Sequence, residues 1–258
     1  MSRDSLGDRI KGYENIQRNY LTRRMPMIIR IDGKAFHSFT KGFQKPFDMV
    51  FMKTMWETTK YLCSNIQGCK VGYTQSDEIS LLLNDYESID SCAWFDKNVQ
   101  KMVSISASMA TLAFNNSFKK IVDEWINEEE NCNEKLNDTY NKRTDTALFD
   151  SRVFVIPSEE VNNYFVWRQQ DATRNSIQMI GQANFAHKQL HGKSCNQIQE
   201  MLFQDKAINF NNLPVYQKRG VCILKETYFK QEAQRTRWAV DEDIPIFNQD
   251  KGYIEKYI

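Results

Sequence analysis

The stretch that decides the fold is Met27-Ile28-Ile29-Arg30-Ile31-Asp32-Gly33, which comes directly after Pro26. It is short, apolar and rich in β-branched residues, and a glycine ends it, which is the pattern of a buried strand. We therefore expect Asp32 at the end of a core strand.

The segments that follow predict a particular order of elements. Residues 47–66 have apolar positions three to four apart and predict a helix. Residues 70–75 and 78–83 predict two strands joined at Ser76-Asp77 by a tight connection. Residues 94–118 predict a second helix and residues 151–157 another strand. The order strand, helix, hairpin, helix, strand is the split βαβ or ferredoxin-like pattern, so the fold class is α+β.

The chain divides into two predicted parts. Residues 1–157 form the sheet-bearing domain, in which a helix over 8–20 covers one face of the sheet and the polar segment 123–145 is a surface excursion. Residues 158–258 form a mainly helical lobe packed on that domain. Its first helix covers 158–182, and a terminal strand pair covers 215–227.

Length and composition exclude several classes of protein. The 258 residues suit one large domain or two packed lobes, and 34 basic against 33 acidic residues give a net charge of +1. That balance argues against coating of nucleic acid by bulk charge. No apolar run approaches a membrane span, and the polar start lacks the centre of a signal peptide, so a cytoplasmic location is expected. Six scattered cysteines are expected to be free thiols.

Acidic residues stand at two strand ends, Asp32 before Gly33 and the pair Asp77-Glu78 after Ser76. In a split βαβ sheet the first strand and the hairpin are neighbours, so these carboxylates would converge on one edge. Oxygen ligands of this kind suit two hard cations, which can activate a hydroxyl and stabilise a leaving pyrophosphate. The alternative is that each Asp merely caps a turn.

The segment after Asp32 offers an anion site. Gly33 permits close backbone approach, successive amides could cradle phosphate oxygens, and Lys34 and His37 could add contacts. The alternative for His37 is a partly buried, satisfied histidine. Further lysines could form a second anion site or a solvated helix face: Lys41, Lys45, Lys97 and Lys101.

Two other groups carry no predicted chemistry. His187 and His191 lie four apart but lack the glutamate of a zinc motif, so a surface helix is expected. The aromatic residues Trp94, Tyr164, Phe165 and Trp167 are expected in the core.

Four segments together resemble the tRNA-histidine guanylyltransferase family, and particularly its bacterial and archaeal Thg1-like branch of 3′-to-5′ polymerases. The matching segments are 29–37 (IRIDGKAFH), 76–80 (SDEIS), 149–153 (FDSRV) and 164–169 (YFVWRQ). The resemblance covers most of the chain.

The resemblance implies a polymerase palm with a defined site. Asp32, the Gly33 carbonyl and Asp77 would hold two Mg²⁺ ions, and Glu78 would also be needed for activity. The incoming nucleotide, GTP or ATP, would bind to Gly33, Lys34, Ala35, Phe36, His37, Ser76 and Asp77. A second triphosphate would bind to Lys97, Lys101 and Ser104, and RNA to Arg174 and Asn175.

The chain departs from the family pattern at two positions. Asn98 replaces an arginine of the second triphosphate motif. Thr173 stands where the eukaryotic enzymes carry a histidine in a His-Ile-Asn-Asn run, which favours the Thg1-like branch and its repair of truncated tRNA 5′ ends.

The leading hypothesis is therefore a nucleotidyltransferase that adds nucleotides to the 5′ end of tRNA, as a homo-oligomer, a tetramer by resemblance. Palm chemistry alone leaves the direction of synthesis open. One alternative is a diguanylate-cyclase-like enzyme, although the hairpin lacks the two glycines expected before its acids. A non-catalytic RNA-binding module is the other.

Overall fold

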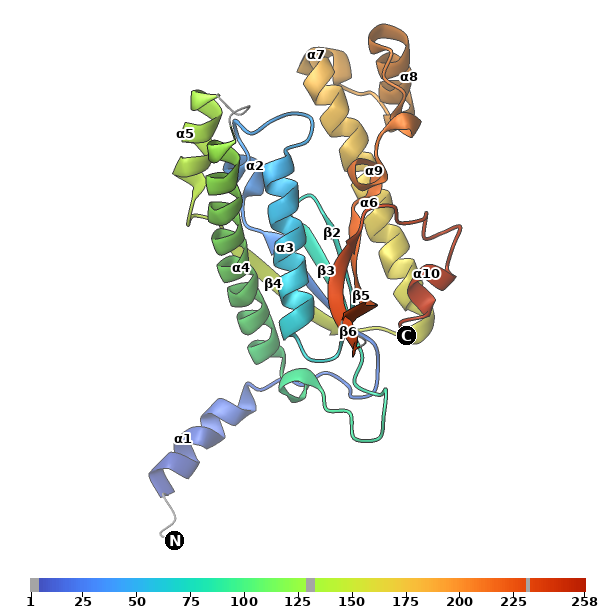
Figure 1. Ribbon diagram of the computed structural model, residues 1–258. Coiled ribbons are helices and arrows are strands. Elements are labelled where there is room, and N and C mark those ends of the chain that lie inside the picture. Colours follow the sequence, from blue (N-terminus) through green and yellow to red (C-terminus); the bar gives the residue numbers. More distant parts are fainter. Residues whose placement is uncertain (1–4, 129–132, 231–232) are drawn as a thin grey trace.

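The computed structural model describes residues 5–128, 133–230 and 233–258, which form one six-stranded antiparallel sheet with helices on both faces (Figure 1). The sheet order is β4-β1-β3-β2-β5-β6. The strands are β1 (Met27–Gly33), β2 (Cys69–Gln75), β3 (Glu78–Leu83), β4 (Phe149–Val155), β5 (Val221–Lys230) and β6 (Ala233–Asp241). The first four, with β1 and β3 in the centre, confirm the split βαβ prediction.

Two long helices cover one face of the sheet, α3 (Met49–Asn65) and α4 (Val99–Asn127). Ile29 and Ile31 of β1 pack against them in the larger core cluster. On the opposite face α6 (Ser158–Asn184) packs over Ile28 through Phe165, and α10 (Gly252–Glu255) lies beside it. The alternation of β1 side chains between the two faces therefore explains its almost wholly apolar sequence.

The hairpin between β2 and β3 is as tight as predicted. Gln75 pairs with Glu78, which leaves only Ser76 and Asp77 in the turn. Ser76 has a φ of 49°, as the first central residue of such a turn requires. This turn brings Asp77 to the end of β1, where Gly33 N donates to the Asp77 carbonyl at 3.1 Å.

The N-terminal helix α1 (Ser5–Ile16) does not cover the sheet, and that prediction is wrong. It projects from the body of the molecule and buries none of its residues (Figure 1). The segment after it is hydrogen-bonded to the chain at the start of α4: Leu21 N donates to the Lys97 carbonyl, and Val99 N donates to the Asn19 carbonyl.

The polar segment 123–145 is also more ordered than an excursion. Its first residues continue α4 to Asn127, and α5 (Glu134–Arg143) follows; residues 129–132 lie outside the described part. Leu136 and Tyr140 of α5 are buried in the main core, so this helix is part of the domain despite its polar composition.

The second half of the chain contains the predicted helices, but its strand pair is displaced. Besides α6 and α10, its helical elements are α7 (His187–Leu190), α8 (Cys195–Lys206), η2 (Phe210–Asn212) and α9 (Val215–Arg219). The strand pair runs over 221–241 rather than 215–227, and β5 pairs with β2. The sheet therefore crosses the predicted boundary at 157/158, which stays a prediction.

Two remaining elements are short, α2 (Phe36–Phe39) and η1 (Trp94–Lys97). The five cysteines in the described part are free thiols. None of the helices described there is long and apolar enough to cross a membrane.

Candidate active site

The two predicted carboxylates meet at the ends of β1 and β3. Asp32 pairs directly with Glu78 in the β1–β3 register, and Asp77 is the residue before Glu78. The Ser76 hydroxyl donates to Asp77 Oδ1 at 3.1 Å. The structure thus brings Asp32 and Asp77 together, as the sequence predicted.

The position of both carboxylates disfavours their charged forms and raises their pKa. Burial raises the pKa of Asp77, and the charge of Asp32 raises it further. Burial also raises the pKa of Asp32, with the neighbouring Asp150 as the second cause. Carboxylates crowded in this way favour a cation between them, because a cation removes their mutual repulsion.

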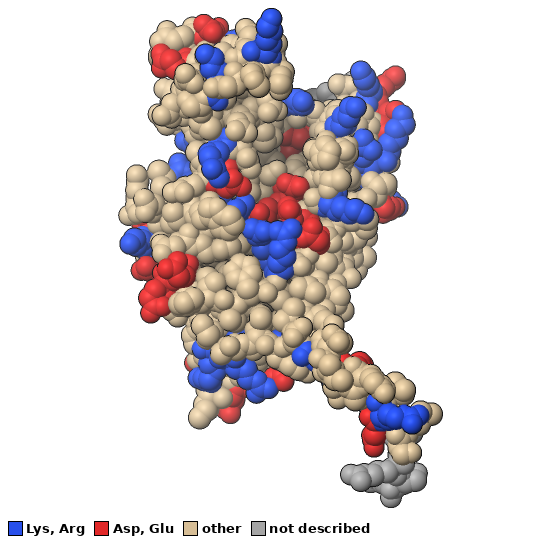
Figure 2. Space-filling view, turned by 180° about the vertical axis from the view of Figure 1, so that it is seen from behind, with Lys and Arg blue, Asp and Glu red and all other residues tan. Residues whose placement is uncertain are grey.

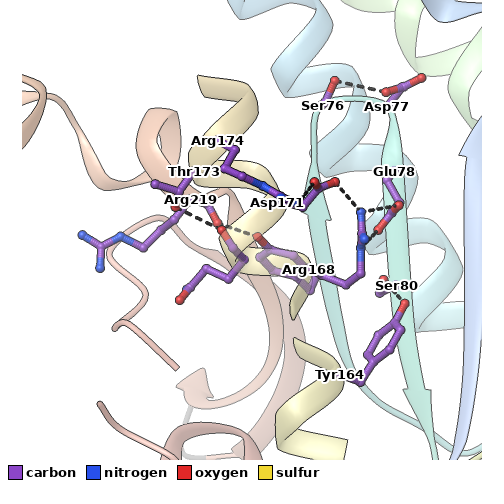
Figure 3. Close-up of polar contacts among 12 residues, drawn as sticks. Ser76, Asp77, Glu78, Ser80, Tyr164, Arg168, Asp171, Thr173, Arg174 and Arg219 are labelled. Carbon is purple, nitrogen blue, oxygen red and sulfur yellow. Dashed lines mark hydrogen bonds and ion pairs between the residues drawn. The ribbon is translucent and has the colours of Figure 1, made fainter. Parts of the chain in front are cut away.

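Glu78 does not face this pair as a free ligand (Figure 3). Its two oxygens accept from Arg168 of α6, Oε1 from Nε at 2.6 Å and Oε2 from Nη2 at 2.9 Å. Arg168 also donates to Asp171 at 2.8 Å. Burial raises the pKa of Glu78 and the Arg168 guanidinium offsets part of that rise. This geometry assigns Glu78 the role of fixing the end of β3 beside Asp32.

The loop after β1 presents backbone donors beside the carboxylates. Among the described residues, the N–H groups of Ala35, Phe36 and His37 donate to no protein acceptor. Ala35 is left-handed, with φ 56°, which turns the chain into α2. Three successive free amides next to a cation site suit phosphate oxygens.

Gly33 and Phe36 shape this loop through packing. A Cβ on Gly33 would lie 2.3 Å from the Phe36 ring, so glycine lets the ring close over the backbone. That ring is buried against Phe39 and Phe114, which means that Phe36 can offer a ligand only its backbone.

A cavity of about 500 Å³ opens beside Asp77, a volume typical of small-molecule sites. Gly33, Ala35, Phe36, His37, Ser76 and Asp77 line it, together with residues 43–46 and Asp48. His37 is exposed and its ring lies beside Ser38 Oγ at 3.0 Å, so it is not the buried histidine of the alternative interpretation. Lys45 lines the cavity, whereas Lys34 and Lys41 are exposed and do not.

Lys97 is not available to a triphosphate, and that prediction is wrong. Its side chain is 1% exposed, and Nζ donates to Asp85 Oδ1 at 3.0 Å and to the carbonyls of Thr22 and Met25. All three ammonium hydrogens are used. Met25 precedes β1, so Lys97 lies near the start of a strand about 20 Å long whose other end carries Asp32.

The other members of the predicted second triphosphate site lie on the surface of α4. Lys101 and Ser104 are exposed, and the Ser104 hydroxyl donates to the Gln100 carbonyl at 2.7 Å. Asn98, which departs from the family pattern, caps α4 by accepting from Lys101 N at 3.0 Å. The asparagine therefore has a structural reason to be there.

The predicted RNA contacts lie further along α6. Arg174 is exposed and pairs with Asp171 at 2.6 Å (Figure 3). Asn175 lines a second, smaller cavity. The Thr173 hydroxyl donates to the Gln169 carbonyl one turn earlier in α6 at 3.0 Å.

The aromatic prediction holds for Trp94, Tyr164 and Phe165 but not for Trp167. Trp167 is 47% exposed, and the guanidinium carbons of Arg30 and Arg168 lie 5.7 and 4.2 Å from its ring centre. The two histidines His187 and His191 are exposed, as expected of a surface helix.

Three charged residues near the site had no predicted role. In the register of β1 and β4, Asp150 lies opposite Asp32 and Arg152 lies opposite Arg30. Arg152 also forms an ion pair with Asp150, with Nη2 3.4 Å from Oδ1. On the face seen in Figure 2, acidic side chains gather near the middle of the molecule with basic side chains beside them. The alternation of residues 149–153 carried a signal for Asp150, but only the β1–β4 register identifies its partner.

Comparison with known proteins gives one consistent result. A family model described as tRNAHis guanylyltransferase matches residues 7–157. The tRNA(His) guanylyltransferase of Debaryomyces hansenii is 29% identical over 267 residues, which span 96% of this chain and 90% of that relative.

Two solved structures of a bacterial tRNA(His) guanylyltransferase (Thg1)-like protein are also similar. The structure in complex with ATP has a TM-score of 0.85 and 46% identity, and the one with GTP has 0.79 and 45%. Each comparison covers 98% of this chain and 99% of the other.

Proposed function

Because this chain belongs to the tRNA(His) guanylyltransferase family, we propose that it adds nucleotides to the 5′ end of tRNA, with GTP and ATP as substrates. The observation that carries the proposal is a cavity lined by Asp77 and by residues 35–37 with their free backbone amides, with Asp32 close enough to Asp77 to raise its pKa. Relatives of 45–46% identity hold ATP and GTP, which supports a nucleoside triphosphate as the occupant.

The donor set fits Mg²⁺. Among the described residues no group of three His, Cys, Asp or Glu side chains is placed to enclose a metal. Two carboxylates with a backbone carbonyl such as that of Gly33 leave room for water and substrate phosphates, which is how Mg²⁺ is commonly bound. When bound, two Mg²⁺ ions would neutralise charge on the attacking and leaving oxygens.

The residues of the chain supply binding and orientation. The amides of Ala35, Phe36 and His37 hold the phosphates of the incoming nucleotide. Ser76 orients the Asp77 carboxylate, and Arg168 holds Glu78 so that the end of β3 stays in register with Asp32.

The reaction joins the incoming nucleotide to an activated RNA end. The 5′ end carries a triphosphate or an adenylyl group. The 3′ hydroxyl of the nucleotide attacks the 5′ phosphorus, a P–O bond forms, and pyrophosphate or AMP leaves with the displaced electron pair. The hydroxyl proton passes to solvent.

Thr173 supports template-dependent repair rather than dedicated guanylylation of histidine tRNA. We further propose that Lys101 and Ser104 contact a second triphosphate, that Arg174 and Asn175 contact RNA, and that the protein acts in the cytoplasm as a homo-oligomer.

One experiment tests the reaction and its template. The protein is incubated with Mg²⁺, four labelled nucleotides and tRNA lacking its first nucleotide, with the opposing base varied over all four. We expect growth at the 5′ end by the base that pairs with the acceptor-stem partner. Addition of G whatever the opposing base, and only on histidine tRNA, contradicts the repair proposal. A cyclic dinucleotide product, or none, contradicts 5′ addition altogether.

A further inference from the structure

The carboxylate of Asp48 is held from three sides. It is 5% exposed, and Oδ1 accepts from Phe51 N at 2.9 Å as the N-cap of α3. Oδ2 accepts from Gln44 N at 2.8 Å and from the Tyr140 hydroxyl at 2.7 Å. The first two bonds are local in sequence, to residues within four positions of Asp48, whereas Tyr140 comes from α5, 92 residues away.

Tyr140 is itself fixed in place. It is 0% exposed, and its ring meets those of Phe43, Phe118 and Trp125 edge-on. Burial raises the pKa of Tyr140 far above its ordinary value, with the charge of Asp48 as the second cause. The hydroxyl therefore keeps its proton and serves as a donor to the carboxylate.

This bond reaches the wall of the nucleotide cavity. Residues 43–46 and Asp48 form part of the wall of the cavity that Gly33, His37 and Asp77 also line. Asp48 Oδ2 closes that wall through Gln44 N, and Tyr140 holds the same oxygen from behind. Loss of the hydroxyl would leave Oδ2 with one donor and free the wall to shift.

We infer that Tyr140 is a positioning residue for nucleotide binding, which acts through Asp48 to set the wall 43–48. The inference rests on the proposed function, because it takes the cavity to hold a nucleoside triphosphate. It assigns α5 a role at the active site without any contact between α5 and the ligand.

The test is Tyr140→Phe with a matched control, Tyr253→Phe. Tyr253 also donates to a carboxylate, Asp241 Oδ2 at 2.6 Å, but it belongs to the core on the α6 face and lines none of the nucleotide cavity. Calorimetry with GTP and Mg²⁺ gives Kd, and nucleotide addition gives KM and kcat. For Tyr140→Phe we expect Kd and KM to rise about tenfold and kcat to change less than threefold, since hydrogen bonds to charged groups are the stronger ones. Tyr253→Phe is expected to lower Tm about as much as Tyr140→Phe does, but to leave Kd for GTP unchanged.

A double-mutant cycle separates this role from general destabilisation. Asp48→Asn keeps the cap acceptor and removes the charge. If Tyr140 acts through Asp48, the effects of Tyr140→Phe and Asp48→Asn on Kd are strongly non-additive. Wild-type Kd in Tyr140→Phe, an equal rise in Tyr253→Phe, or additive effects would overturn the inference. Failure of the wild-type protein to bind either GTP or ATP would instead overturn the proposed function.

Discussion

Replacement of Arg168 by methionine should expose how much the fold depends on one buried ion pair. Arg168 and Glu78 are 5% and 8% exposed and share two hydrogen bonds of 2.6 and 2.9 Å. Methionine keeps most of the volume but leaves the Glu78 carboxylate buried without its partner.

The expected cost follows from that burial. Removal of one partner of a buried pair costs about 3–5 kcal/mol, because the remaining charge is uncompensated. For a chain of this size Tm falls by about 2–4 °C per kcal/mol, so the Arg168→Met variant should melt about 6–20 °C lower at pH 8.

The cost should also depend on pH in a defined direction. Burial already raises the pKa of Glu78 in the folded protein, and loss of Arg168 removes the opposing influence and raises it further. A carboxyl group whose pKa is higher in the folded than in the unfolded state lowers the free energy of unfolding when it is ionised. This penalty becomes smaller as the pH falls and the group is protonated. The difference in free energy of unfolding between variant and wild type should therefore shrink from pH 8 to pH 5.

The assay is urea denaturation at pH 8 and pH 5. It compares wild type with Arg168→Met and with the double variant Glu78→Gln/Arg168→Met. The double variant removes the stranded charge and should recover part of the loss. A single variant within 1 kcal/mol of wild type at pH 8, or a difference that grows toward pH 5, refutes the reasoning.

Three further predictions concern Asp77 and the two lysines, Lys97 and Lys101. Asp77→Asn should reduce nucleotide addition more than 100-fold yet raise or maintain Tm without Mg²⁺, because burial and Asp32 raise the pKa of Asp77 and its charge therefore costs stability at neutral pH. Differential scanning fluorimetry checks this, and Mg²⁺ should stabilise wild type but not the variant. Lys97→Met should lower Tm through loss of the Asp85 pair and leave KM for 5′-triphosphorylated RNA unchanged; a raised KM for that RNA with normal Tm would restore its predicted role. Lys101→Ala should leave Tm within about 1 °C, since an exposed lysine contributes little, and weaken use of 5′-triphosphorylated RNA; equal KM for that RNA would place Lys101 on a solvated face.

The central part of the fold could be predicted because its signals are local. The apolar run before Gly33 and the two-residue spacing at Ser76-Asp77 determine a strand and a turn by short-range chemistry. The placement of Asp32 beside Asp77 then follows from the ferredoxin-like order alone.

The errors have non-local causes. Lys97 has the spacing of a ligand, but its partner Asp85 and the carbonyls before β1 are identified only by the tertiary structure. The polar composition of α5 gave no sign that Tyr140 is buried, because only two of its ten residues, Leu136 and Tyr140, pack into the core. The N-terminal helix was predicted to cover one face of the sheet, but α3 and α4 cover one face and α6 covers the other.

The alternation along β1 and β3 explains why the chemistry lies where it does. Ile29, Ile31 and Ile79 face α3 and α4, so the even-numbered residues of these strands face α6. Asp32 and Glu78 are then on the face that α6 covers, and the Arg168 of that helix is the cation that makes a buried Glu78 tolerable. A register slip of one residue between β1 and β3 would separate Asp32 from Glu78 and move Asp77 away from Gly33 N. The Arg168–Glu78 pair therefore fixes the end of β3 against α6, and the β1–β3 register then places Asp32 beside that fixed end.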